Sequence, residues 1–188
     1  MNDIIEFASK AEFAKWLQSN EKQSKGVWLR LAKKGAVSPT VTYAEAIDVA
    51  LCYGWIDGQK KPDNTEYWLQ RFTPRTAKSI WSKINQTKVI ALIESGAMKP
   101  SGLQEIERAK KDGRWARAYA GAKTISIPPD LQKALDQNPE AHAFFKTLNS
   151  QNRYAILFRI GNVVKAETRA KKITQFVEML EQGRTIYR

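Results

Sequence analysis

The most strongly patterned stretch of the chain is Thr42-Tyr43-Ala44-Glu45-Ala46-Ile47-Asp48-Val49-Ala50-Leu51-Cys52-Tyr53-Gly54. Thr42 and Glu45 form a capping box, in which a hydroxyl and a carboxylate each accept a hydrogen bond from a free backbone N–H at a helix start. Apolar side chains then recur at helical spacing as far as Leu51. We therefore predict an amphipathic helix that ends at Gly54 in a left-handed conformation.

Regular patterns also lie on both sides of this helix. Upstream, a second capping box at Ser9–Glu12 opens a helix over residues 10–19, and alternating side chains predict a strand over residues 26–32. Downstream, residues 55–58 form a turn or the start of a strand, and the aromatic-rich residues 65–72 form a strand that ends before Pro74. The N-terminal part is therefore predicted to be α+β, with helices packed on a small sheet.

Helical patterns fill the rest of the chain. Seven helices are expected, each with a start or stop signal, over residues 79–86, 87–95, 103–112 and 128–135, from residue 139, from residue 150, and over residues 166–182. The predicted fold class is thus α+β, with a mainly helical C-terminal half. We expect an α+β domain over residues 1–122 and a helical region over residues 123–188, packed on the first as one compact unit.

The composition excludes several classes of protein. The 188 residues include one cysteine and one histidine, so an internal disulfide and a clustered Cys/His zinc site are both excluded. Because no P-loop, dinucleotide-binding or EF-hand motif is present, we expect no cofactor and no metal. The first residues include early acids and no long apolar run, so we expect a cytoplasmic protein without a membrane span.

The positive charge is concentrated in the middle of the chain. The net charge is +12, of which residues 58–123 contribute +8, from fourteen basic and six acidic residues. A localised positive surface attracts nucleic acid, anionic headgroups or acidic ligands, although net charge also serves solubility. The middle segment is therefore where we expect a polyanion or an anionic ligand to bind.

Several unusual motifs follow one another in a fixed order: the Trp28 strand, the Thr42-Tyr43 helix, and residues 51–58, 71–75, 79–85, 96–102 and 113–115. Together they resemble the bacteriocin-protection, YdeI/OmpD-associated family over most of the chain. Residues 167–173 resemble the family's closing helix, with Val163, Val164 and Lys172 as departures from its pattern. The family name implies protection against antimicrobial peptides and association with an outer-membrane porin.

Our first functional hypothesis is a cytosolic, non-enzymatic binding protein of this family, linked to stress or antimicrobial-peptide protection, with an unknown anionic ligand or protein partner. Aromatic rings with guanidinium groups between them can bind anionic ring compounds. The candidate ligand-binding residues are Trp55, Asp57, Arg71, Arg75, Trp81, Ser82 and Asn85. The structural alternative is that the tryptophans fill a core while the arginines bind backbone carbonyls or Asp57.

Two other hypotheses use different residues or a different chemistry. A nucleic-acid-binding protein would contact phosphates and bases through Lys110, Lys111, Arg114, Trp115 and Arg117. An enzyme would act on an anionic small molecule with Asp57 as acid or base, although no nucleophile motif supports it and we assign no catalytic residue. We expect Ser79 to cap a helix and Cys52 to behave as a small buried apolar residue.

Overall fold

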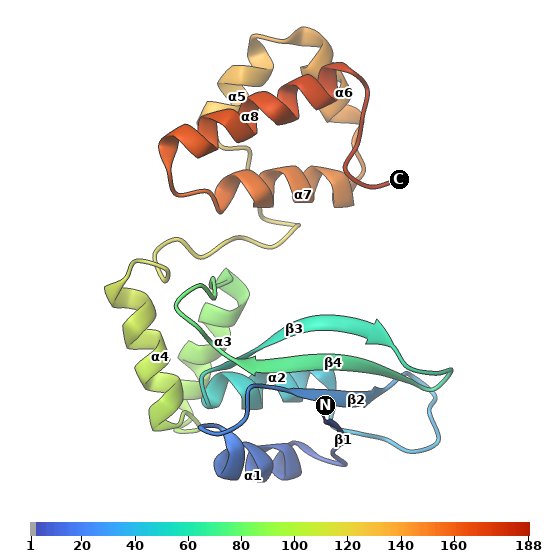
Figure 1. Cartoon of the computed structure of the whole chain (residues 1–188), viewed down its shortest axis with the longest axis vertical. Helices are drawn as coiled ribbons and strands as arrows, with labels where there is room; N and C mark the ends of the chain where they lie inside the picture. Colours follow the sequence, from blue (N-terminus) through green and yellow to red (C-terminus); the bar gives the residue numbers. More distant parts are fainter. Residues whose placement is uncertain (1–2) are drawn as a thin grey trace. The chain divides into compact units, whose positions relative to one another are not determined.

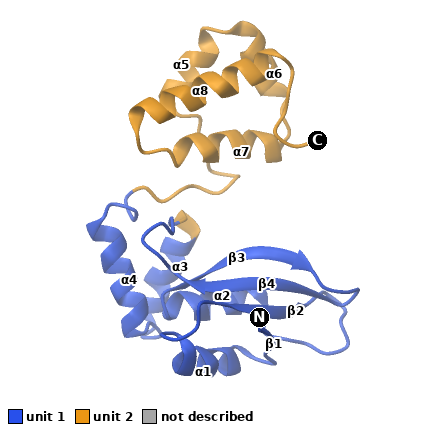
Figure 2. Ribbon diagram, viewed as in Figure 1, with its two compact units in different colours: residues 1–81, 85–116 blue, residues 82–84, 117–188 orange. Residues whose placement is uncertain are grey.

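The structure is a computed structural model that describes residues 3–188. It divides into two compact units, Met1–Trp81 with Asn85–Ala116 (unit 1) and Ser82–Ile84 with Arg117–Arg188 (unit 2; Figure 2). Unit 1 contains the sheet and the helices packed on it, whereas unit 2 is helical, which confirms the α+β class. The packing of the two parts as one compact unit stays a prediction.

Unit 1 is built from four strands and four helices (Figure 1). In chain order these are β1 (Ile4–Glu6), α1 (Lys10–Asn20), β2 (Val27–Ala32), α2 (Tyr43–Cys52), β3 (Trp55–Pro62), β4 (Tyr67–Pro74), α3 (Lys83–Glu94) and α4 (Pro100–Lys111). The strand order is β1-β2-β4-β3; β1 runs parallel to β2, and the two other pairs are antiparallel. Strand β4 is therefore central, and β3 forms one edge of the sheet.

One face of the sheet carries the core of unit 1. Residues directly opposite each other on neighbouring strands share a face, so Val27 and Phe72 lie together, as do Trp55 and Pro74. Helix α1 packs on this face, where the Phe13 and Phe72 ring centroids are 5.7 Å apart. Trp28 and Arg71 pair on the opposite face.

The strongest sequence signals are confirmed. Thr42 and Glu45 form the reciprocal capping box, and Ser9 accepts a hydrogen bond from the backbone N–H of Glu12 at the start of α1. Gly54 adopts a φ of 71° after α2, and Gly96 adopts a φ of 70° after α3, as expected for residues that end helices. Local capping chemistry thus fixes where these helices begin and end.

Two predictions are wrong in detail, and one strand was not predicted. The helices expected over residues 79–86 and 87–95 are a single helix, α3, which begins only at Lys83. Ser79 therefore caps no helix; its hydroxyl accepts a hydrogen bond from the backbone N–H of Thr76 instead. Strand β1 was not expected, because three residues are too few to show an alternating pattern.

Unit 2 contains four helices around one apolar cluster. They are α5 (Pro129–Asp136), α6 (Pro139–Thr147), α7 (Ser150–Gly161) and α8 (Ala166–Glu181). Phe145 and Ile156 are fully buried in the cluster, and Ile173, Phe176 and Leu180 line the inner stripe of α8, as their helical spacing predicts. The start signals at Pro129, Pro139 and Ser150 are all confirmed.

An ion pair in unit 2 predicts a dependence of stability on pH. The Arg169 guanidinium hydrogen-bonds the Asp130 carboxylate, with Nη2 2.9 Å from Oδ1, and lowers the pKa of Asp130. A lowered pKa in the folded state stabilises the fold above the carboxylate's ordinary pKa of about 3.9, and this contribution is lost as the pH falls through the lowered value. Asp130→Asn should thus cost up to about 1 kcal/mol at pH 7, because the pair is partly exposed, and this cost should shrink as the pH falls below about 3.9.

Hydrogen exchange of the amides of α5 and α8, compared between the natural chain and Asp130→Asn at each pH, measures this difference. Glu140→Gln is the matched control, since Glu140 also lies in the first turn of a helix and is exposed. Equal protection of the two chains at pH 7 would contradict the prediction.

Candidate ligand-binding site

The tryptophans of the predicted site lie largely inside unit 1. Trp55 and Trp81 are 1% and 2% exposed, and only Trp115 is partly accessible. The Trp55 ring meets Trp16 of α1 edge to face, with centroids 6.0 Å apart. Trp81 lies between the Arg75 guanidinium, 3.7 Å from its ring centre, and the ring of Trp115. The faces of Trp55 and Trp81 are therefore occupied by protein, as the structural alternative expects.

Two buried arginines hold the loop between β4 and α3. Arg75 donates to the carbonyl oxygen of Ile80 at 3.1 Å. Arg114 donates to the carbonyl oxygens of Thr76 and Ser79 at 3.1 and 2.9 Å, and its Nη1 lies 3.2 Å from a carboxylate oxygen of Glu105. These arginines thus bind backbone carbonyls, and they connect three of the motifs noted in the sequence.

The remaining candidate residues lie in different places. Asp57 opposes Phe72 on the helix-covered face of the sheet, whereas Arg71 lies on the other face, 5.8 Å from the Trp28 ring centre. Ser82 is buried at a bridge to Tyr119, and Asn85 is half-buried in the first turn of α3. None of the clefts described below is lined by all seven side chains. Their role in ligand binding therefore stays a prediction.

The residues of the nucleic-acid hypothesis differ in how far they are exposed to solvent. Arg114 is 7% exposed, and hydrogen bonds from it hold the pKa of Asp112 below its ordinary range. Lys110 pairs with Glu107 at 2.8 Å. Lys111 and Arg117 are exposed, but Arg117 belongs to unit 2. Contrary to our expectation, Arg114 is thus turned inward and does not face solvent.

A basic aromatic cleft lies instead at the end of the sheet where β2 finishes. Its volume is about 620 Å³, and it is lined by Ala32, Lys33, Lys34, Lys60, Lys61, Pro62 and Trp68. Trp68 of β4 lies between the ends of two strands, since it pairs with Leu31 of β2 and with Pro62 of β3. The pairing of the strands thus brings together two Lys-Lys dipeptides that are far apart in the sequence.

A β-bulge in β3 positions Lys60 over the Trp68 ring. The register shifts between Asp57 and Lys60, so Lys60 opposes Gln70 and lies on the same face as Trp68. Buried Gln70 donates to the carbonyl oxygens of Gly58 and Gln59 at 3.0 and 3.2 Å, which satisfies the backbone of the bulge. As a result the Lys60 ammonium lies 4.2 Å from the Trp68 ring centre.

The charge of this cleft is not neutralised by neighbouring acids. None of its lining residues is acidic, and no carboxylate of the described residues lies within 4 Å of its four ammonium groups. The nearby carboxylates are engaged elsewhere, since Asp63 pairs with Arg30 at 3.0 Å and Glu66 accepts a backbone hydrogen bond from Val37. The cleft is therefore a local positive field beside an aromatic ring.

Asp57 is the one predicted site residue close to the cleft. Its carboxylate accepts a hydrogen bond of 2.8 Å from the hydroxyl of Tyr43, and the Tyr43 ring lies 5.8 Å from the ring of Trp68. A second hollow of about 360 Å³ is lined by Tyr43 and shares Trp68, Lys33 and Lys34 with the cleft. Asp57 therefore orients Tyr43 at the edge of this region.

Among the described residues, no group of three or more His, Cys, Asp and Glu side chains is placed to hold a metal ion. Within the same residues, no helix combines the length and the apolar character needed to cross a membrane.

The two units match two different families. Residues 5–105, more than half of the chain, match the family described as a domain of unknown function (DUF8412), and the chain belongs to that family. Residues 124–183 match the family described as bacteriocin-protection, YdeI or OmpD-associated, which supports the resemblance for that part of the chain only. Comparison with curated proteins and with solved structures gave no match.

These matches change how the sequence motifs are interpreted. Those between residues 51 and 102 lie in the part that matches the domain of unknown function, and residues 113–115 lie outside both matched ranges. Of the quoted motifs, only residues 167–173, which lie in α8, fall where the YdeI- or OmpD-associated family matches. The basic aromatic cleft therefore belongs to the family whose function is unknown.

Proposed function

We propose that unit 1 is a non-catalytic binding module that holds a small anionic ring compound, such as a nucleoside phosphate, in the basic aromatic cleft. The observation that carries this proposal is a cleft lined by Trp68 and four lysines, in which Lys60 lies over the Trp68 ring and no lining residue is acidic. Ammonium groups bind phosphate and carboxylate oxygens as point charges, and an aromatic wall favours a flat apolar partner. The volume of about 620 Å³ lies within the range of small-ligand sites.

Mutation of the cleft should weaken binding of such a ligand. With adenosine monophosphate as the probe, Trp68→Ala should raise the Kd about fivefold, because loss of an aromatic contact costs on the order of 1 kcal/mol. Lys60→Gln should also weaken binding, and the effect should shrink as salt screens the charge. Isothermal titration calorimetry at low and physiological ionic strength measures both changes.

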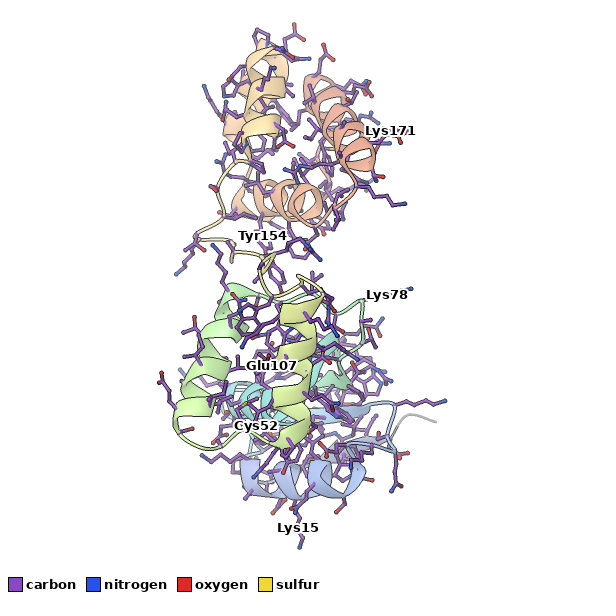
Figure 3. All side chains as sticks on the ribbon, turned by 90° about the vertical axis from the view of Figure 1, so that its left-hand side faces the viewer. Lys15, Cys52, Lys78, Glu107, Tyr154 and Lys171 are labelled. Carbon is purple, nitrogen blue, oxygen red and sulfur yellow. The ribbon has the colours of Figure 1, made fainter. Side chains whose placement is uncertain are left out.

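Lys78→Gln is the matched control, since Lys78 is an exposed lysine outside the cleft that extends into solvent in Figure 3. If Lys78→Gln and Lys60→Gln reduced affinity equally, the binding would depend on the net charge and not on the cleft. If only single-stranded oligonucleotides bound, the nucleic-acid hypothesis would replace this proposal. The hypothesis that Asp57 acts in catalysis stays a prediction.

A role in bacteriocin protection rests on the family matched by residues 124–183 alone. The net charge of +12 disfavours direct capture of a cationic peptide, so any such role would be indirect. Survival of cells with and without the protein, challenged with antimicrobial peptides of both charge signs, tests the role. Identical survival would show that this protein does not have the protective role that the family name describes.

A further inference from the structure

A second cleft lies between the helices of unit 1, away from Trp68. Its volume is about 560 Å³, and facing sides of α1 and α2 form two of its walls. The end of α3 and the segment before α4 close the third side. All of its lining residues belong to unit 1. The small side chains of Ala11 and Ala14 on α1 leave this space open.

The walls of this inter-helix cleft are mainly apolar. Ala11, Ala14, Val49, Leu92 and Ala97 present methyl groups to it. Apolar walls favour the apolar body of a ligand, which gains about 25 cal/mol for each Å² removed from water. The volume suits a ligand of small-molecule size.

Tyr53 and Cys52 add polar groups to the lining of the cleft. Tyr53 is 7% exposed, and its hydroxyl forms no hydrogen bond with any residue of the described chain. Burial raises the pKa of Tyr53 and of the Cys52 thiol, so both are neutral at neutral pH. The hydroxyl of Tyr53 reaches solvent in the cleft, so a ligand bound there can accept a hydrogen bond from it.

The rim of the cleft favours a negative charge. Lys10, Lys15 and Lys99 line it, and no carboxylate of the described residues lies within 4 Å of their ammonium groups. Two acidic residues, Glu45 and Asp48, also line the cleft and leave the three lysines in excess by one charge. The Glu45 carboxylate closes the capping box, and the Asp48 carboxylate lies 2.6 Å from the Lys88 ammonium.

We infer that the inter-helix cleft binds an organic monoanion with an apolar body, namely an alkyl or aryl carboxylate. The apolar body lies against the alanine and valine side chains, and the carboxylate lies at the lysine rim. This site is independent of the basic aromatic cleft, which offers more positive charge and a tryptophan ring. The two sites therefore differ in the class of ligand that they select.

Octanoate is the probe, with octan-1-ol and octylamine as controls that keep the alkyl chain and change the charge. NMR titration should shift the methyl signals of Val49 and Leu92 with octanoate, and at least tenfold weaker binding is expected for the two controls. Cys52 gives a second readout, because it is the only cysteine in the chain and its position is labelled in Figure 3. Octanoate at saturation should slow its alkylation by N-ethylmaleimide at least fivefold.

Two kinds of variant test the geometry. Ala14→Leu fills the cleft and should reduce octanoate affinity at least tenfold, with Ala11→Leu as the substitute if that chain does not fold. Lys99→Gln should reduce affinity several-fold, whereas Lys22→Gln, which changes a lysine outside the cleft, should not. Trp68→Ala should leave octanoate binding unchanged, which separates this inference from the proposed function. Unshifted methyl signals, or equal binding of octylamine, would overturn it.

Discussion

Arg114→Ala should lower the free energy of unfolding of unit 1 by about 2 kcal/mol, because a buried cation that holds a loop by several hydrogen bonds is removed. The guanidinium is 7% exposed and supplies donors to Glu105 and to the carbonyl oxygens of Thr76 and Ser79. Alanine leaves the Glu105 carboxylate, itself 7% exposed, with Arg108 as its remaining cation. It also leaves two loop carbonyls without their donor, and each such loss adds to the cost.

Tryptophan fluorescence during urea unfolding measures this effect, because all six tryptophans lie in unit 1. Lys110→Ala is the matched control. Lys110 lies in α4, four residues before Arg114, and its ion pair with Glu107 is exposed, so its loss should cost less than about 0.5 kcal/mol. Similar small effects for both variants would show that the buried ion pair does not hold the loop.

The predicted role of Arg114 explains why the Trp- and Arg-rich middle of the sequence is so distinctive. Arg75 stacks on Trp81, Arg114 binds the loop that leads to Trp81, and Glu105 of α4 pairs with Arg114. Each motif supplies one part of a network that joins β4, the loop and α4. The network therefore accounts for these residues as structural elements without requiring a ligand.

Much of the fold could be predicted from the sequence because its signals are local. The Thr42 capping box, the glycine at position 54 and the apolar stripe of α8 each act within a few residues. Such signals correspond directly to backbone hydrogen bonds and helix faces. Helix α3 was harder to predict, because its start at Lys83 follows from a loop held by the distant Arg114.

The basic aromatic cleft could not be predicted from local patterns. Its two Lys-Lys dipeptides meet only because β4 lies between β2 and β3, with Trp68 opposite both Leu31 and Pro62. The bulge that turns Lys60 toward Trp68 depends on Gln70, which is in another strand. Two features of the sequence point to the cleft. Gly58 lies within a strand, which is typical of a bulge, and a Lys-Lys dipeptide lies at each strand end.

The close approach of α2 and α4 leads to a second large expected effect, for Gly102→Ala. Gly102 lies in α4, where alanine normally stabilises a helix by about 1 kcal/mol relative to glycine. A Cβ at this position would overlap the carbonyl oxygen of Cys52 and would lie 2.7 Å from the Met98 methyl group. The carbonyl belongs to the end of α2 and accepts a hydrogen bond from the Lys99 backbone, so it cannot move freely.

We therefore expect Gly102→Ala to destabilise unit 1 by about 2 kcal/mol, because overpacking against backbone outweighs the gain in helix propensity. Gly161→Ala is the matched control, since Gly161 is also helical and a Cβ there would meet no atom within 4 Å. That substitution should stabilise unit 2 by about 0.5 kcal/mol. Urea unfolding followed by tryptophan fluorescence reports on the first variant, and hydrogen exchange of the α7 amides reports on the second. Effects of the same sign would show that α2 and α4 can separate at little cost, whereas opposite signs would show that the missing side chain at position 102 sets their approach.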